Sequence, residues 1–104
     1  MLRKASIMFV DKDKIDEYKR RHDELWPEME KTLKEHGVHN YSIFVEESTG
    51  RLFAYLELDH NHKWDEIAKT EVCQKWWKFM APIMETNEDY SPVSIELKEV
   101  FHLD

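Results

Sequence analysis

Residues 39–58, with the sequence HNYSIFVEESTGRLFAYLEL, decide the fold that the rest of the chain must complete. Two runs rich in β-branched and aromatic residues, 39–47 and 51–58, predict two strands. The Ser-Thr-Gly sequence at 48–50 is typical of a turn, so we expect the strands to form a hairpin. Apolar residues occupy odd and even positions of both runs, which indicates that both faces of the sheet are covered.

A strand and a helical segment precede the hairpin. Residues 4–10 (KASIMFV) predict a strand, after which Asp11 and Asp13 offer oxygens that can cap a helix. From residue 15 onward, apolar positions recur at intervals of three and four, as in a helix with one buried face. This stripe comprises Ile15, Tyr18, His22, Leu25, Met29 and Leu33.

Pro27 interrupts the stripe, because proline has no N–H to donate. The helix is therefore expected either to kink near Trp26 or to restart with Pro27 in its first turn. Gly37 suits the left-handed backbone that closes a helix.

A second helical region and a last strand follow the hairpin. Residues 61–69 predict a short helix, and Thr70 can cap a longer one. Residues 87–92 are dense in turn formers, and the alternation over 93–103 predicts a strand. The buried stripe of the longer helix is expected to comprise Val72, Trp76, Phe79, Met80 and Ile83, flanked by Cys73, Trp77 and Met84.

The predicted order of elements is β-α-β-β-α-β, the order of the ferredoxin-like motif. We therefore expect an α+β fold: one domain over residues 1–104, with an antiparallel sheet covered by helices on one face. Since the strands carry apolar residues at both parities, the second face also needs cover. A homodimer with sheets packed face to face is the simplest way to supply it.

Composition narrows the classes of function. With 22 acidic and 15 basic residues, the net charge of −7 disfavours nucleic-acid and anionic-membrane partners. No run approaches the ~20 apolar residues of a membrane span. The single cysteine, Cys73, fits a reducing compartment, so a cytoplasmic protein is expected. Only two glycines occur, which disfavours a phosphate-binding loop.

Tyr18 and His22 lie four residues apart on the inward stripe, so they should be neighbours. The structural alternative is a core histidine whose polar atoms are satisfied by Tyr18 or by the backbone. The functional alternative is general acid–base chemistry, because the unperturbed pKa of histidine suits proton transfer near neutral pH.

The pair Trp76-Trp77 and Tyr41 are candidate substrate contacts. Adjacent helical residues point ~100° apart, so one indole can fill the core while the other lies at the flank or at a dimer contact. Alternatively, one or both rings line a pocket, since aromatic faces suit the C–H faces of a sugar. Tyr41 either packs within its strand or offers a hydroxyl to a polar ligand.

Two further chemistries have weak signals. The pairs His60/His62 and His36/His39 lack a recognisable set of metal ligands, so no metal is expected. Cys73 has no local catalytic signature and is interpreted as a buried structural thiol.

Four stretches, taken together and in order, resemble the L-rhamnose mutarotase family over essentially the whole chain. They are EYKRRH (17–22) with LWPE (25–28), HGVHNYSI (36–43), TEVCQKWWKFM (70–80), and SPVS (91–94) with LKEVF (97–101). The resemblance implies a ferredoxin-like dimeric α+β barrel that interconverts the anomers of L-rhamnose in the cytoplasm without a cofactor.

The resemblance also implies roles for individual residues. His22 matches the family's proton donor, and it would act in protonated form on the ring oxygen of the sugar. Tyr18, Tyr41, Trp76 and Trp77 match substrate-contacting positions. The general base stays unidentified: a tyrosine, a water or His22 acting in turn. Tyr90 departs from the family pattern, which has a small polar residue there, and this puts strict sugar preference in doubt.

Two rival hypotheses follow from the same architecture, because fold alone does not fix function. One is an oxygenase, cofactor-free or haem-linked, that uses His22 beside an aromatic substrate or as a haem ligand. The other is a non-enzymatic sugar-binding module. A Soret band would favour haem, and sugar binding without faster anomer exchange would favour the module.

Overall fold

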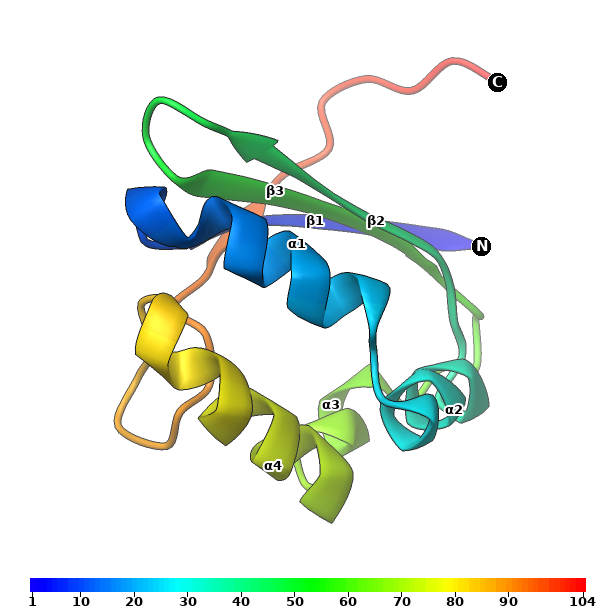
Figure 1. Cartoon of the computed structure of the whole chain (residues 1–104). Helices are drawn as coiled ribbons and strands as arrows, with labels where there is room; N and C mark the ends of the chain where they lie inside the picture. The colour runs from blue at the N-terminus through cyan, green and yellow to red at the C-terminus, as the bar shows by residue number, and fades with distance from the viewer.

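The computed structural model describes all 104 residues and places the helices on one side of a four-stranded sheet (Figure 1). The strands are β1 (Leu2–Phe9), β2 (Val38–Glu46), β3 (Arg51–Leu58) and β4 (Ile95–Leu97). The helices are α1 (Ile15–Asp23), α2 (Pro27–Glu35), α3 (Trp64–Ile67) and α4 (Glu71–Met80), and two 3₁₀ turns, η1 (Lys12–Lys14) and η2 (Ala81–Ile83), adjoin them.

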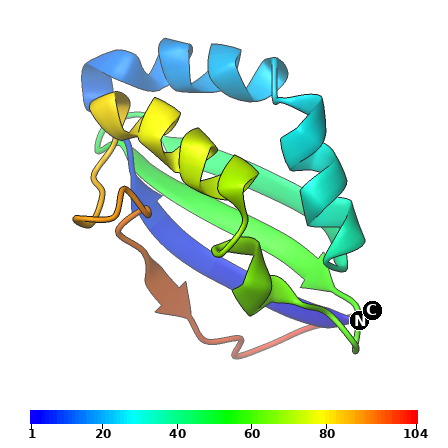
Figure 2. The same cartoon turned by 90° about the horizontal axis from the view of Figure 1, so that it is seen from below.

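The sheet has the order β2-β3-β1-β4, and every neighbouring pair is antiparallel. This order confirms the predicted ferredoxin-like α+β fold. The two central strands are β1 and β3, which pair along their whole length from Leu2–Leu58 to Phe9–Arg51. In Figure 2 the helices α1, α2 and α4 lie over one face of the sheet.

Strand alternation separates a core face from an open face. Leu52, Ala54, Leu56 and Leu58 of β3 are buried under the helices. The residues between them in sequence, such as Phe53, therefore point to the opposite face, which no helix covers.

The region around Pro27 follows the second of the two predicted alternatives. Helix α1 ends at Asp23, and Pro27 is the first residue of α2, where its missing N–H costs no helical hydrogen bond. Gly37 closes α2 with a φ of +88°, as expected. The predicted side-chain caps at Asp11 and Asp13 are wrong, because the backbone carbonyl of Asp11 accepts from the Lys14 N–H instead.

Three other sequence predictions need correction. Of the predicted helix over 61–69, only Trp64–Ile67 is helical, as α3. Of the predicted last strand over 93–103, only residues 95–97 pair with β1. Beyond Leu97 the chain no longer pairs with β1, although β1 continues to Leu2, because an alternation of apolar residues does not determine whether a segment stays hydrogen-bonded to its neighbour. The buried face of α4 is also rotated: Cys73 is buried, whereas Phe79 is 38% exposed.

Candidate active site

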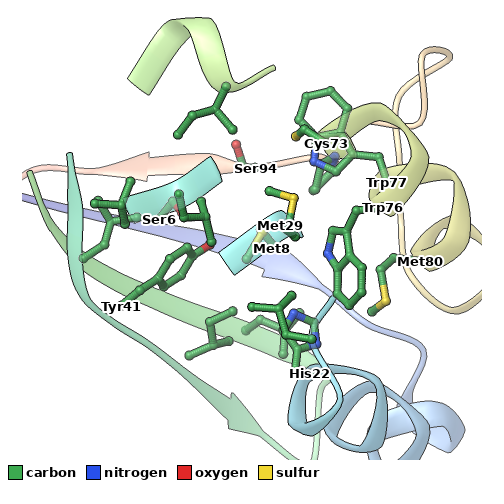
Figure 3. Close-up of a pocket in the computed structure, with 18 of the residues that line it drawn as sticks. Ser6, Met8, His22, Met29, Tyr41, Cys73, Trp76, Trp77, Met80 and Ser94 are labelled. Carbon is green, nitrogen blue, oxygen red and sulfur yellow. The ribbon is translucent and has the colours of Figure 1, made fainter. Parts of the chain in front are cut away.

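A cavity of about 1470 Å³ lies between the core face of the sheet and the helices (Figure 3). All five residues singled out from the sequence line this cavity. Its wall contains Tyr18, His22, Tyr41, Trp76 and Trp77. Helix α1 supplies the first two residues, β2 supplies Tyr41, and α4 supplies both tryptophans.

His22 is held in one tautomer by a local hydrogen bond. Its Nδ1 lies 3.0 Å from the backbone oxygen of Tyr18, one helical turn earlier. Because a carbonyl oxygen only accepts, Nδ1 must carry the proton, and Nε2 of the neutral ring keeps its lone pair. No protein group bonds to Nε2. His22 therefore has one nitrogen fixed by the protein and one available to a ligand.

Burial adjusts the acidity of His22. The half-buried ring loses hydration of its charged form, which lowers its pKa below the ordinary 6.5, while the bond to Tyr18 and the nearby Asp23 oppose that effect. The neutral form of His22 therefore predominates at neutral pH.

Two aromatic rings fix the orientation of the imidazole. Tyr18 stacks against it with centroids 4.2 Å apart and planes inclined by 27°. Trp76 meets it edge-on, with centroids 5.4 Å apart at 87°. Since Trp76 is only 7% exposed, the indole also serves as a rigid support for His22.

The tyrosine hydroxyls remain protonated in this environment. Burial raises the pKa of Tyr18 above its ordinary value and raises the pKa of Tyr41 to about 12. Tyr41 as a whole is 38% exposed, yet its phenol group is enclosed, and in Figure 3 the ring projects from β2 into the cavity. At neutral pH both phenols can therefore donate hydrogen bonds but cannot act as bases.

The two tryptophans have different surroundings. The ring of Trp76 packs edge-on against Trp26, with centroids 5.0 Å apart, and is tilted by 49° against Phe79, with centroids 5.6 Å apart. Trp77 is half-buried and lines the cavity as well. The structural interpretation and the pocket interpretation of the pair therefore each hold in part, because Trp76 is buried in the core and both indoles line the cavity.

Arg21 connects the two helices that carry the site. Its guanidinium donates from Nη1 to the backbone oxygen of Phe79 at 2.6 Å and from Nε to Glu17 at 2.7 Å. It also lies 4.3 Å from the centroid of the Phe79 ring. These contacts tie α1, with His22, to the carboxyl end of α4, where a cation is favoured by the helix dipole.

Sequence reasoning missed other cavity residues. Ser6 and Ser94 place hydroxyls in the wall, and Met8, Met29 and Met80 supply apolar surface. A serine inside the apolar run of β1 was the available signal for Ser6. The methionines gave no separate signal, because they follow the same periodicity as ordinary core residues.

The remaining candidates do not gather into a reactive cluster. Cys73 is buried, and desolvation raises the pKa of its thiol to about 11. No group of three or more His, Cys, Asp or Glu side chains is arranged to hold a metal ion. None of the helices has the length and apolar character that crossing a bilayer requires.

Comparisons with known proteins place this architecture among named relatives. The model of the family described as L-rhamnose mutarotase matches residues 3–103. An L-rhamnose mutarotase of Bacillus subtilis (strain 168) is 66% identical over 104 residues, all of both chains. One from Shouchella clausii (strain KSM-K16) is 64% identical over 103 residues, 99% of each chain.

Solved structures agree with the sequence comparisons. The crystal structure of an L-rhamnose mutarotase from Formosa agariphila superimposes with a TM-score of 0.94 at 45% identity, covering all of both chains. An antibiotic biosynthesis monooxygenase is similar at a TM-score of 0.63 and 20% identity, over 96% of this chain and 99% of the other. At that identity the second likeness shows the shared fold alone.

Proposed function

The chain belongs to the L-rhamnose mutarotase family, and from this premise we propose that it is an isomerase that interconverts the α and β anomers of L-rhamnose. One observation carries the chemical part of the proposal. His22 presents a free Nε2 to a cavity that two protonated phenols and two indoles also line. That arrangement supplies one proton-transfer group, hydrogen-bond donors for hydroxyls and aromatic surface for a sugar face.

The opening step needs two proton movements at neighbouring oxygens of the sugar. Neutral His22 takes the proton of the anomeric hydroxyl at Nε2, and the electron pair left on that oxygen forms the C=O bond as the bond from C1 to the ring oxygen breaks. The ring oxygen receives the proton back from Nε2. His22 is thus the proton donor to the ring oxygen, and the proton that it donates is one it first removed from the substrate.

The closing step is the reverse on the other face of the aldehyde. After rotation about C1–C2, the former ring hydroxyl gives its proton to Nε2 and attacks C1, and the carbonyl oxygen takes the proton. The other anomer results with no net change in protons or electrons. This cycle needs no second base, which agrees with the raised pKa values of Tyr18 and Tyr41.

The remaining site residues bind the sugar in this proposal. The phenols of Tyr18 and Tyr41 donate to sugar hydroxyls, and the indoles of Trp76 and Trp77 contact a C–H face. A positioned acid–base group contributes roughly 10²–10⁴-fold to a rate. That is sufficient for a reaction that already proceeds slowly in water.

The rival hypotheses have less support. The likeness to a monooxygenase extends to the fold only, whereas the likeness to L-rhamnose mutarotases extends to sequence over the full chain. In the binding-module alternative the free Nε2 of His22 would only accept a hydrogen bond from a sugar hydroxyl. The full-length likeness to L-rhamnose mutarotases favours the enzyme instead.

We further propose that the protein is a cytoplasmic homodimer. The open face of the sheet carries Ile7, Phe44, Phe53, Ile95 and Leu97, all turned away from the helices. Phe44 is 69% exposed and Ile95 is 52% exposed, so a second copy packed on this face would bury substantial apolar surface. The single buried thiol of Cys73 fits a reducing compartment.

Saturation-transfer NMR on L-rhamnose tests the proposed activity. The protein is expected to speed exchange between the two anomeric resonances far above the protein-free rate. Binding of L-rhamnose, seen as a change in tryptophan fluorescence, without faster exchange would contradict the proposal and favour a binding module.

A further inference from the structure

The strand that carries Tyr41 contains an irregularity at Asn40. His39 pairs with Glu57, and Ser42 pairs with Tyr55. Asn40 and Tyr41 therefore both lie opposite one residue of β3, Leu56. This two-against-one arrangement is a β-bulge. Asn40 has a φ of +47°, in the left-handed region that asparagine tolerates better than most side chains.

The bulge changes which side chains face the helices. In a regular strand, residues three positions apart point to opposite faces. Val38 and Tyr41 are three apart, yet Val38 pairs with Leu58 and Tyr41 lies opposite Leu56, which are both buried on the core face of β3. Asn40 borders the same cavity beside Tyr41. The extra residue therefore allows Tyr41 to point into the cavity while Val38, which is 4% exposed, stays in the core.

The side chain of Asn40 is itself fixed on the neighbouring strand. Its Nδ2 donates to Glu57 at 2.7 Å, and the same carboxylate accepts from the Tyr55 hydroxyl at 2.8 Å. These two hydrogen bonds hold the pKa of Glu57 below its usual value. The bulge is thus secured by a backbone conformation and by a hydrogen-bonded carboxylate.

We propose that Asn40 is a positioning residue for the reaction: its left-handed backbone forms the bulge that aims the Tyr41 hydroxyl at the substrate. Nothing in this assignment requires Asn40 to touch the sugar. It rests on the proposed function through Tyr41, which binds the sugar in that proposal.

Substitutions at Asn40 separate backbone conformation from side-chain chemistry. In Asn40→Val, a β-branched residue is forced to positive φ, so the bulge is strained and the aim of Tyr41 is lost. Asn40→Gly lacks the hydrogen bond to Glu57 but adopts positive φ freely. We expect KM for L-rhamnose to rise about 10-fold in Asn40→Val, the order expected for a lost hydrogen bond, and to return near the wild-type value in Asn40→Gly.

A double-mutant cycle with Tyr41→Ala shows whether Asn40 acts through Tyr41. If it does, Asn40→Val adds nothing to KM once the Tyr41 side chain is absent. Additive effects would overturn the proposal, as would equal losses in the glycine and valine variants, or an unchanged KM in Tyr41→Ala. Should Asn40→Val fail to fold, Asn40→Ala imposes a smaller strain at the same position and takes its place in the cycle.

A titration that does not depend on catalysis keeps this inference separate from the proposed activity. The ¹³Cζ resonance of Tyr41 is expected to titrate near pH 12 in wild type and in Asn40→Gly, and nearer its ordinary 10 in Asn40→Val, where water reaches the phenol. An unchanged Tyr41 titration in Asn40→Val would overturn the positioning role. Absence of L-rhamnose exchange in wild type would instead overturn the proposed function, whatever the titration shows.

Discussion

At the scale of single residues, two histidines share one local structure and differ in their surroundings. His22 places Nδ1 3.0 Å from the carbonyl four residues earlier, and His36 does the same at 2.7 Å with Thr32. Of these two histidines, His22 lines the cavity and His36 does not. The local bond fixes the tautomer in each case, so the difference in chemistry must come from the cavity and from the rings of Tyr18 and Trp76.

The pH dependence of catalysis reports the resting form of His22. Neutral His22 takes the first proton in the proposed cycle, so kcat/KM should fall as pH is lowered through the pKa of His22, about tenfold per unit once well below it. Because burial lowers that pKa, the fall should begin below 6.5.

Anomer exchange measured between pH 5 and 8, with the protein-free rate subtracted at each pH, checks this prediction. A rate that increases as the pH falls through the same range would show that protonated His22 is the resting form, the alternative that the family resemblance implies.

At the scale of elements, one hydroxyl starts the helix that carries both tryptophans. The Thr70 Oγ1 accepts from the Cys73 N–H at 3.3 Å and donates to the Ile67 carbonyl at 2.7 Å. It thereby caps α4 and joins it to α3. Capping by Thr70 was predictable, because it depends on residues close in sequence.

Thr70→Ala should lower the free energy of unfolding by about 1 kcal/mol, the usual effect of losing an N-cap. Thr70→Ser keeps the oxygen and should stay close to wild type. Urea denaturation of the three proteins measures the difference. Equal midpoints for Thr70→Ala and wild type would mean that the cap contributes nothing to the stability of α4.

Other elements could not be read from local sequence. The position of Phe79 depends on tertiary contacts with other segments, since Arg21 of α1 and Trp26, which caps α2, both contact its ring. The end of β4 at Leu97 depends on where the chain departs from β1, which itself continues to Leu2. The bulge at Asn40 depends on the register with β3. All three features depend on tertiary contacts, which the periodicity of a single segment cannot predict.

At the scale of the whole molecule, helices cover only one face of the sheet. The helices bury the core face, while the open face and the C-terminal tail present apolar side chains, with Val100 89% and Phe101 78% exposed. The tail leaves the body on the side away from the helices (red in Figure 1). The apolar parity of the strands already indicated this incomplete face, and it is the basis for proposing a homodimer.

A charge placed on the open face should separate the proposed dimer. Phe44 lies opposite Phe53 at the centre of the β2–β3 pair. Phe44→Glu would bury a carboxylate against an apolar partner, so the variant should be monomeric. Asn61→Glu adds the same charge at an exposed turn and serves as the control.

Light scattering at micromolar concentration checks both variants. Wild type and Asn61→Glu should have twice the 12.7 kDa mass of the chain, and Phe44→Glu should have that mass once. A wild-type protein of single mass would contradict the proposed homodimer.

The five site residues could be singled out from sequence because the family motifs cover them. Residue patterns alone left His22, Tyr41 and the tryptophans with structural alternatives of equal or greater weight. Residue patterns could not predict the hydrogen bond from Nδ1 of His22 to the Tyr18 carbonyl, which leaves Nε2 available, because that bond depends on the rotamer of His22. Nor could they bring Ser6 and Ser94 to the same cavity, since these lie at opposite ends of the chain.

In the proposed mechanism His22, through its free Nε2, performs both proton transfers in the mutarotation of L-rhamnose. The most direct test is anomer exchange of L-rhamnose by saturation-transfer NMR, with wild type, His22→Asn and His36→Asn compared at equal concentration. The exchange rate with His22→Asn should be roughly 10²–10⁴-fold lower than with wild type, while the rate with His36→Asn should stay within about twofold. Full activity in His22→Asn, or an equal loss in both variants, would contradict the proposed mechanism.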